Sequence, residues 1–355
     1  MKIPHFSKIH NRFQLNGHPM DRETLLDVAY SFVKEGEAFE QELGDFLFYW
    51  LDNQSRIRVK TSGATGNPKN LEVSKQAMVH SAVLTGEYFN LEPGQRALHC
   101  LPASFIAGKM MLVRAMILGL SLDVIPPTTT PQLSKGSTYD FAAMIPVQVS
   151  NCLSQLKQLR TLIIGGAPLP SKLRATLETS HTGAYETYGM TETLSHVAIR
   201  PITSTHKVFT TLPNVGVATD EEGCLVITAL HVSPTPITTK DVVDCQSATS
   251  FTYLGRKDFM INSGGRKLHP EQLEEKLSPL VSCPFFIHKM ADDTYGERPI
   301  LVLEGEKAPF SKADLKAWGV LEKWELPEQI ICLKSFKRTS SGKVQRLATL
   351  EKALG

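Results

Sequence analysis

Short apolar runs recur along the first 190 residues and alternate with stretches of helical character. The runs lie at residues 97–101, 121–125, 141–145, 161–164 and 183–185. Residues 108–118, 147–156 and 170–179, which lie between the runs, are predicted as helices. A chain in which strands alternate with helices favours an α/β layered fold. We therefore expect a large N-terminal domain with a mostly parallel sheet.

A polar segment near the start joins a strand to a helix. Residues 22–51 are predicted as helical, and residues 57–60 as a short strand. Helical character returns at residues 74–89, where the Ser74 hydroxyl can cap the first turn. We therefore expect the segment between them, residues 61–69, to connect a strand to a helix.

The pattern changes near residue 223, where short strands replace the alternation. Strands are predicted in CLVITAL and FTYLGR and at 284–290 and 299–304, and helices at 270–277 and 311–323. A basic segment follows. We place a domain boundary at residues 254–257, which gives a large domain, 1–255, and a small α+β domain, 256–355.

Composition narrows the classes of partner. The 355 residues suffice for two domains, and 38 basic against 36 acidic residues leave a formal charge of only +2. That balance gives no case for nucleic acid or an anionic membrane. Six separated cysteines without a C-x-x-C pair indicate neither a zinc site nor a disulfide framework. With no signal peptide, and Arg114 and Asp123 interrupting the most apolar stretch, we expect a cytoplasmic protein without membrane insertion. The oligomeric state stays open, a homodimer included.

The most informative segment is TSGATGNPK at residues 61–69. Its glycines allow several backbone N–H groups to converge on one anion, and its hydroxyls and lysine add donors and charge. It is not a Walker A sequence, and an ordinary polar turn is the alternative. The candidate phosphate ligands are Thr61, Ser62, Gly63, Thr65, Gly66 and Lys69.

Five segments in order resemble the signatures of the adenylate-forming (AMP-binding) superfamily, which includes the acyl-CoA synthetases. They are the 61–69 loop, GGAP at 165–168, YGMTE at 188–192, GRKD at 255–258 running into SGGRK at 263–267, and SGKVQR at 341–346. The resemblance covers the chain from about residue 57 onward. It implies that ATP activates a carboxylic acid as its acyl-adenylate and that coenzyme A then takes the acyl group.

The resemblance also implies an ATP site in the large domain. Glycine backbone can approach a flat adenine ring closely, and Tyr188 offers an aromatic face to it. Asp241 falls where the family has an aspartate that accepts hydrogen bonds from both ribose hydroxyls, although the usual T-G-D reads T-K-D here. The alternatives are that Tyr188 is an ordinary core aromatic and that Arg256 is an ordinary surface side chain. The residues implied are Gly165, Gly166, Ala167, Tyr188, Gly189, Asp241 and Arg256.

Three residues are implied to act on the reacting groups. Thr191 would donate to the α-phosphate, and Glu192 would hold Mg²⁺, a hard cation that prefers carboxylate and phosphate oxygens. A helix cap is the alternative for this pair. Lys343 would bridge the carboxylate and the α-phosphate with its mobile ammonium group. The alternative is an ordinary solvent-exposed lysine.

The small domain is implied to be mobile. Asp258 matches the family's hinge, about which rotation would exchange the face presented to the active site. Gly264 and Gly265 resemble the segment that lines the tunnel for the pantetheine of coenzyme A. These residues would serve transfer to the thiol.

Three segments are most similar to the o-succinylbenzoate–CoA ligases: residues 101–119, 144–153 and 291–304. That acid carries an aromatic ring and a second carboxylate, so its pocket needs apolar walls and a cation or hydroxyls. Lys109 is notable because a cation in an apolar helix is costly without a partner, unless its ammonium reaches solvent. The candidate pocket residues are Phe105, Lys109, Gln148, Ser195 and His196.

Two departures from the family pattern accompany this similarity. Phe105 stands where the motif usually has histidine, which bears on access to the acyl site. Only about 60 residues precede the phosphate loop, so we expect a reduced N-terminal subdomain.

Three other functions are compatible with parts of this pattern. Another acyl- or aryl-CoA ligase is one, although a fatty-acid enzyme would need a long apolar tunnel, against which Lys109 argues. A stand-alone adenylation enzyme that loads a carrier protein is the second; no carrier domain follows Arg346. A catalytically dead ATP-binding protein is the third, against which Lys343 and Glu192 argue.

Overall fold

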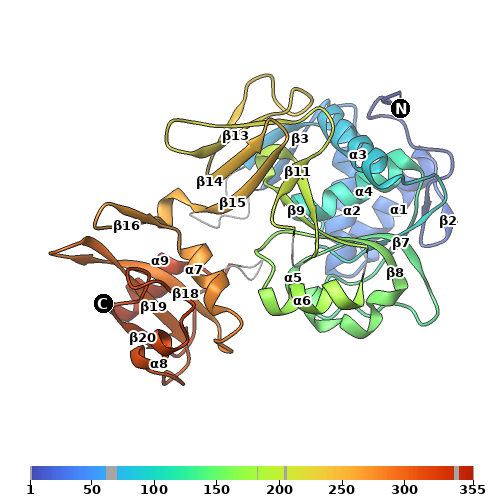
Figure 1. Cartoon of the computed structure of the whole chain (residues 1–355). Coiled ribbons are helices and arrows are strands. Elements are labelled where there is room, and N and C mark those ends of the chain that lie inside the picture. Colours follow the sequence, from blue (N-terminus) through green and yellow to red (C-terminus); the bar gives the residue numbers. More distant parts are fainter. Residues whose placement is uncertain (1, 61–69, 182, 204–205, 340–343, 355) are drawn as a thin grey trace.

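Two sheets organise the computed structural model, which describes residues 2–60, 70–181, 183–203, 206–339 and 344–354 (Figure 1). One sheet has 13 strands and ends at Arg256, and the other has five strands and begins at Ile261. A strand pair, β3 (Arg56–Lys60) and β4 (Asn70–Ser74), stands apart. The expected strand-to-helix connection was wrong, because the strand β4 precedes the helix that begins at Lys75. Within these ranges no helix combines the length and the apolar character needed to cross a membrane.

Parallel strands form the half of the large sheet built from the earlier residues. The strands β5 to β9 pair in the order β9-β8-β7-β5-β6, and β1 (Gln14–Leu15) continues that order in parallel with β6. Their bounds are β5 (Arg96–His99), β6 (Ser121–Val124), β7 (Tyr139–Met144), β8 (Leu159–Ile164) and β9 (Ala184–Gly189). The α/β class and the parallel strands expected from the apolar runs are confirmed.

The sheet continues beyond β9 in antiparallel strands, in the order β10-β11-β15-β14-β13-β12. At the opposite edge β2 (His18–Pro19) pairs antiparallel with β1. The bounds are β10 (His196–Pro201), β11 (Phe209–Thr211), β12 (Gly216–Thr219), β13 (Cys224–Thr228), β14 (Ile237–Ser247) and β15 (Ser250–Arg256).

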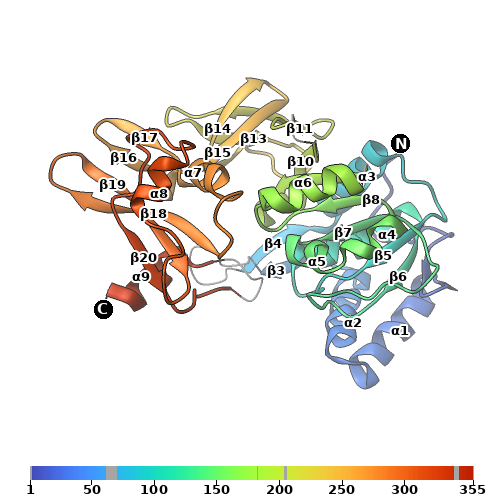
Figure 2. The same ribbon diagram turned by 60° about the horizontal axis from the view of Figure 1, so that its bottom comes forward.

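The parallel strands are covered on both faces, as their apolar sequences require. Alternate residues such as Ala97 and Phe141 join the larger core cluster, while Leu98 and Ala142 join a second cluster. The first face is covered by α1 (Arg22–Glu35), α2 (Ala38–Leu51), α3 (Lys75–Phe89) and α4 (Ile106–Leu118). The second is covered by α5 (Pro146–Asn151), η1 (Leu153–Gln158) and α6 (Ser171–Ser180). Figure 2 shows α1 and α2 side by side.

The start of α3 is fixed to the end of α2. The Ser74 hydroxyl accepts from the N–H of Ala77, which confirms the predicted cap. Lys75 is fully buried, and its Nζ lies 2.5 Å from Asp52 Oδ1. A buried lysine with a carboxylate partner in this position ties the base of the β3–β4 pair to the helical layer.

The five-stranded sheet is made by residues after the large sheet. It comprises β16 (Ile261–Ser263), β17 (Arg266–Leu268), β18 (Phe285–Asp292), β19 (Gly296–Glu304) and β20 (Ile330–Leu333). Three helices accompany it: α7 (Pro270–Leu277), α8 (Lys312–Ala317) and α9 (Arg346–Leu354). Between the sheets lie η3 (Lys257–Phe259) and Met260.

Three helical regions predicted from the sequence are shorter or more divided than expected. The helix predicted at 147–156 was wrong as one α-helix, because α5 ends at Asn151 and the 3-10 helix η1 begins at Leu153. The helical region at 22–51 is two helices, because the chain leaves the helical conformation at Gly36. The helix predicted at 311–323 was wrong beyond Ala317, because Gly319 adopts a left-handed φ of 69° that ends it.

Candidate functional site

The loops that carry two of the motifs follow the carboxyl ends of neighbouring parallel strands in the large sheet. The parallel strands β7, β8 and β9 end at Met144, Ile164 and Gly189, and the loops that follow carry the GGAP and MTE residues. In open α/β sheets, ligands bind outside the carboxyl ends of the parallel strands. This edge is therefore the candidate site.

The turn after β8 requires a glycine. The N–H of Gly165 donates to Met144 O at 3.2 Å, and a Cβ at residue 165 would lie 2.4 Å from Thr187 Oγ1. Gly166 follows, exposed and with a φ of 83°. The turn is therefore pressed against β9 with its backbone open to solvent, as close approach to a flat ring requires.

Tyr188 and Asp241 meet across the sheet. The phenol of Tyr188 donates to Asp241 Oδ2 at 2.5 Å, and Arg256 Nη1 donates to Asp241 Oδ1 at 3.2 Å. Burial, followed by the Asp241 charge, raises the pKa of Tyr188. Each oxygen of the buried carboxylate thus accepts one hydrogen bond from the chain and keeps lone-pair capacity for a ligand hydroxyl.

Residues after β9 present polar groups in a tight turn. Thr191 and Glu192 lie in η2 (Thr191–Thr193), with Thr191 half-buried and Glu192 exposed. An accessible carboxylate at this edge suits a hard cation. Leu194 then adopts a φ of 65°, and the chain enters β10 at His196.

A buried arginine faces the start of β10. Arg114 of α4 is 2% exposed; its Nη2 donates to Ser195 Oγ and lies 3.4 Å from His196 Nδ1, and its Nε donates to Thr85 Oγ1 at 3.3 Å. We call Thr85, Arg114, Ser195 and His196 the arginine cluster. No acidic group of the described residues forms an ion pair with Arg114, and burial lowers its pKa to about 9. A guanidinium desolvated without a counter-ion is unfavourable unless an anion joins it.

The structure brings Ser195 and His196 together but keeps Lys109 and Gln148 apart from them. Lys109 Nζ donates to Ala103 O and lies 5.4 Å from the ring centre of Phe46 in α2. Gln148 Nε2 donates to Cys100 O at 2.7 Å and Thr128 O at 2.9 Å, which uses both of its N–H donors inside the fold.

Other predicted residues lie at separate places. Phe105 is the half-buried N-cap of α4. Gly264 and Gly265 form the turn between β16 and β17, in the five-stranded sheet, and Asp258 lies in η3 with Lys240 Nζ 3.0 Å from its Oδ1. The predicted phosphate-loop residues lie outside the described residues, and so does Lys343. The loop residues concerned are Thr61, Ser62, Gly63, Thr65, Gly66 and Lys69.

Arg114 and Thr85 are site candidates that sequence reasoning missed. A signal was present, because the residues three and four positions from Arg114 in α4 are Met110, Met111, Ile117 and Leu118. None can pair with a guanidinium on the helix surface.

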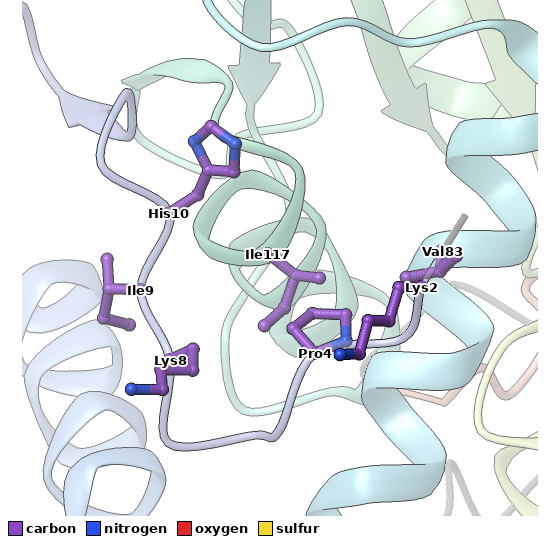
Figure 3. A pocket seen from close by; sticks show the side chains of 7 residues that line it. All are labelled: Lys2, Pro4, Lys8, Ile9, His10, Val83 and Ile117. Atoms are coloured by element: carbon purple, nitrogen blue, oxygen red, sulfur yellow. The ribbon is translucent and has the colours of Figure 1, made fainter.

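A cavity of about 210 Å³ lies elsewhere, where the N-terminal segment crosses α3 and α4 (Figure 3). Its lining includes Pro4, Ile9, His10, Val83 and Ile117. None of these residues belongs to the motifs above, so this cavity is separate from the candidate site.

Comparison with known proteins identifies the family. The family model described as AMP-binding enzyme matches residues 60–230. A probable 2-succinylbenzoate–CoA ligase of Mycobacterium tuberculosis (strain CDC 1551 / Oshkosh) is 28% identical, with 86% of each chain covered. A 2-succinylbenzoate–CoA ligase of Staphylococcus aureus (strain MSSA476) is 26% identical over 91% of this chain and 73% of the relative.

Solved structures agree. An acyl-CoA synthetase (AMP-forming)/AMP-acid ligase II-like protein from Dyadobacter fermentans is 31% identical, with 92% of this chain and 97% of that chain covered and a TM-score of 0.60. The O-succinylbenzoate coenzyme A synthetase of Bacillus subtilis, in complex with ATP and magnesium, shares the fold with a TM-score of 0.72 at 20% identity, covering 82% and 69% of the two chains. The chain therefore belongs to the AMP-binding enzyme family, among the AMP-forming acyl-CoA synthetases.

Proposed function

We propose that this enzyme joins an aromatic dicarboxylic acid, 2-succinylbenzoate, to coenzyme A at the expense of ATP. The relatives named for this reaction support the acid, and so does the placement of the arginine cluster at the sheet edge that carries the MTE turn. The family supports the activation of a carboxylate through its adenylate.

Arg114 is the observation that carries the choice of acid. A fatty-acid pocket has no use for a buried guanidinium, whereas an acid with two carboxylates can react through one and bind through the other. Arginine suits the second role, because its guanidinium keeps its positive charge when buried and carries several N–H donors. The hydroxyls of Ser195 and Thr85, which contact the same guanidinium, hold its fork in place.

The reaction proposed has two steps. The free carboxylate of the acid attacks the α-phosphorus of ATP; pyrophosphate leaves and a mixed anhydride forms. The thiol of coenzyme A then attacks the acyl carbon; AMP leaves and the thioester forms. The chain's part is to position reactants and to offset charge rather than to supply a nucleophile.

Named residues take roles in the first step. Asp241 and Arg256 would hold the ribose, the turn at Gly165 and the ring of Tyr188 the adenine, and Thr191 the α-phosphate. Glu192 is exposed at this edge and would hold Mg²⁺, which supplies positive charge beside the phosphate oxygens when bound. We assign adenylation to Lys343, and phosphate binding to the 61–69 loop, on the family pattern.

For the second step we propose that residues 1–255 and 256–355 act as two domains. The chain crosses between its two sheets at η3, which contains Asp258, so this is where a rotation would occur. Rotation would withdraw Lys343 and bring Gly264 and Gly265 to the pantetheine arm of coenzyme A.

Pyrophosphate release with a panel of acids, with and without coenzyme A, tests the proposal. We expect rapid release with 2-succinylbenzoate and formation of its thioester only when coenzyme A is present. Activity on fatty acids alone would contradict the choice of acid. Transfer to a carrier protein but not to coenzyme A would contradict the choice of acceptor.

A further inference from the structure

The two ring nitrogens of His196 differ in their hydrogen bonding within the described part of the chain. It is the first residue of β10, and 7% of it is exposed. Its Nδ1 lies 3.4 Å from Arg114 Nη2 and 3.2 Å from Ser195 Oγ. Its Nε2 is buried and has no hydrogen-bond partner among the described residues. A buried polar atom without a partner in a native fold calls for a physical reason.

The protonation of the ring follows from its neighbours. A guanidinium carries only donors, so the nitrogen that faces Arg114 must accept. Burial, followed by the Arg114 charge, holds the pKa of His196 well below its usual range, so the ring is neutral. A neutral imidazole that accepts at Nδ1 carries its proton on Nε2. The ring therefore presents one N–H donor that has no acceptor among the residues the structure describes.

Two backbone features hold this arrangement. Leu194 has a φ of 65°, a conformation that costs a branched residue free energy and persists only where the surroundings enforce it. A Cβ at Gly189 would lie 2.3 Å from Ser195 O, so β9 and the start of β10 approach each other closely. Such strain is concentrated where a site must be held in one geometry.

We propose that His196 is a specificity-determining residue, whose Nε2–H donates a hydrogen bond to a neutral oxygen that the acid carries beside its Arg114-bound carboxylate. This inference rests on the proposed function. The ketone of 2-succinylbenzoate is such an oxygen, since it lies ortho to the ring carboxylate. An acid without it would leave the donor unpaired in a buried site, a stronger ground for rejection than a change of size.

A matched pair of acids tests the hydrogen bond. In 2-(3-carboxypropyl)benzoate a methylene replaces the ketone. For the wild-type chain we expect kcat/KM for pyrophosphate release to favour the ketone about tenfold to a hundredfold. His196→Phe should bring the preference close to one, whereas His196→Gln, which retains an N–H donor, should keep part of it. Equal preference in the wild type and His196→Phe would overturn the proposal.

His99 offers the control. It is a buried histidine of β5 whose two ring nitrogens also have no partner among the described residues, and it lies outside the arginine cluster. His99→Phe should leave the preference for the ketone unchanged. A loss of preference in this variant would show that the effect comes from the core at large and would overturn the role of His196.

A second measurement needs no variant activity. In the full-length chain with ¹⁵N-labelled histidine, the His196 signal should show a neutral ring protonated at Nε2 at pH 7. A proton on Nδ1, or on both nitrogens, would overturn the proposal. If the wild type releases no pyrophosphate with either acid, the proposed function fails and the inference about His196 fails with it. Release with both acids at equal kcat/KM would overturn the inference about His196 alone.

Discussion

Arg114 and Arg346 are both largely buried, yet their surroundings differ. Arg346 Nη2 lies 2.9 Å from Glu274 Oε2 and 3.8 Å from Glu271 Oε1, and its Nη1 donates to Ile287 O at 3.1 Å. Arg114 has two hydroxyls and an imidazole but no carboxylate of the described residues. Among the described residues, the guanidinium of Arg346 has carboxylates to balance its charge, and that of Arg114 has none.

The difference separates a structural role from a binding role. Arg346 joins the start of α9 to α7 and to β18, so its charge is used to assemble the small sheet and its helices. Arg114 is buried but has no carboxylate partner among the described residues. The proposed acid would supply that counter-ion. The burial of a charged side chain therefore does not distinguish a structural role from a binding role unless its partners are also known.

The largest effect should come from removing Arg346. Arg346→Met leaves Glu271 and Glu274 without their cation, so we expect the free energy of unfolding to fall by about 3–5 kcal/mol. Urea denaturation followed by circular dichroism measures it. A change below about 1 kcal/mol would contradict the structural role.

Arg114→Met should act on catalysis instead. We expect the free energy of unfolding to stay level or rise, because an unpaired buried charge is removed. The kcat/KM for 2-succinylbenzoate should fall about a hundredfold to a thousandfold, while that for 4-oxo-4-phenylbutanoate, which lacks the ring carboxylate, should hardly change. Equal losses for both acids would argue that Arg114 shapes the fold rather than binds the carboxylate.

The pH dependence of stability sharpens the contrast. Burial, against the opposing charge of Arg346, raises the pKa of Glu274 from 4.5 to about 7. Between these values the folded chain holds more protons than the unfolded chain, so this group's stabilising contribution is present below pH 4.5 and is lost as the pH rises towards 7. The slope is at most about 1.4 kcal/mol per pH unit. Urea titrations from pH 4.5 to 7.5 should show a flatter decline for Glu274→Gln than for the wild type; identical slopes would refute it.

The smallest effect concerns Lys109. Lys109→Met removes the hydrogen bond to Ala103 O and the contact with Phe46, so we expect a loss of about 1 kcal/mol of unfolding free energy. The ratio of kcat/KM between 2-succinylbenzoate and 4-oxo-4-phenylbutanoate should stay as in the wild type. A collapse of that ratio would return Lys109 to the acid site.

Local pattern predicted the centre of the fold and failed at its edges. The strands β5 to β9 were found because buried parallel strands read as short apolar runs. β14 was not found, because most of its residues are polar and its buried residues, which include Val242 and Val243, do not alternate with exposed ones. Single glycines at 36 and 319 ended helices that a periodic pattern alone would continue.

Residues of the candidate site could be proposed from the sequence where they belong to a motif. Contacts between residues far apart in the sequence could not. Tyr188 and Asp241 were both singled out, but their hydrogen bond depends on the pairing of distant strands. Gln148 resembled a pocket residue until its amide met the carbonyl of Cys100, 48 positions earlier. Arg114 was passed over as an interruption of an apolar stretch, although its lack of a local partner was already visible.

The missing counter-ion of Arg114 also bears on the lifetime of the chain. On the proposal above, the bound acid supplies a charge that the folded protein lacks and the unfolded protein does not need. Binding only to the folded form raises stability by about 2.7 kcal/mol when the free acid stands at a hundred times its Kd. A supply of substrate would then lower the fraction of chains that are open to proteases.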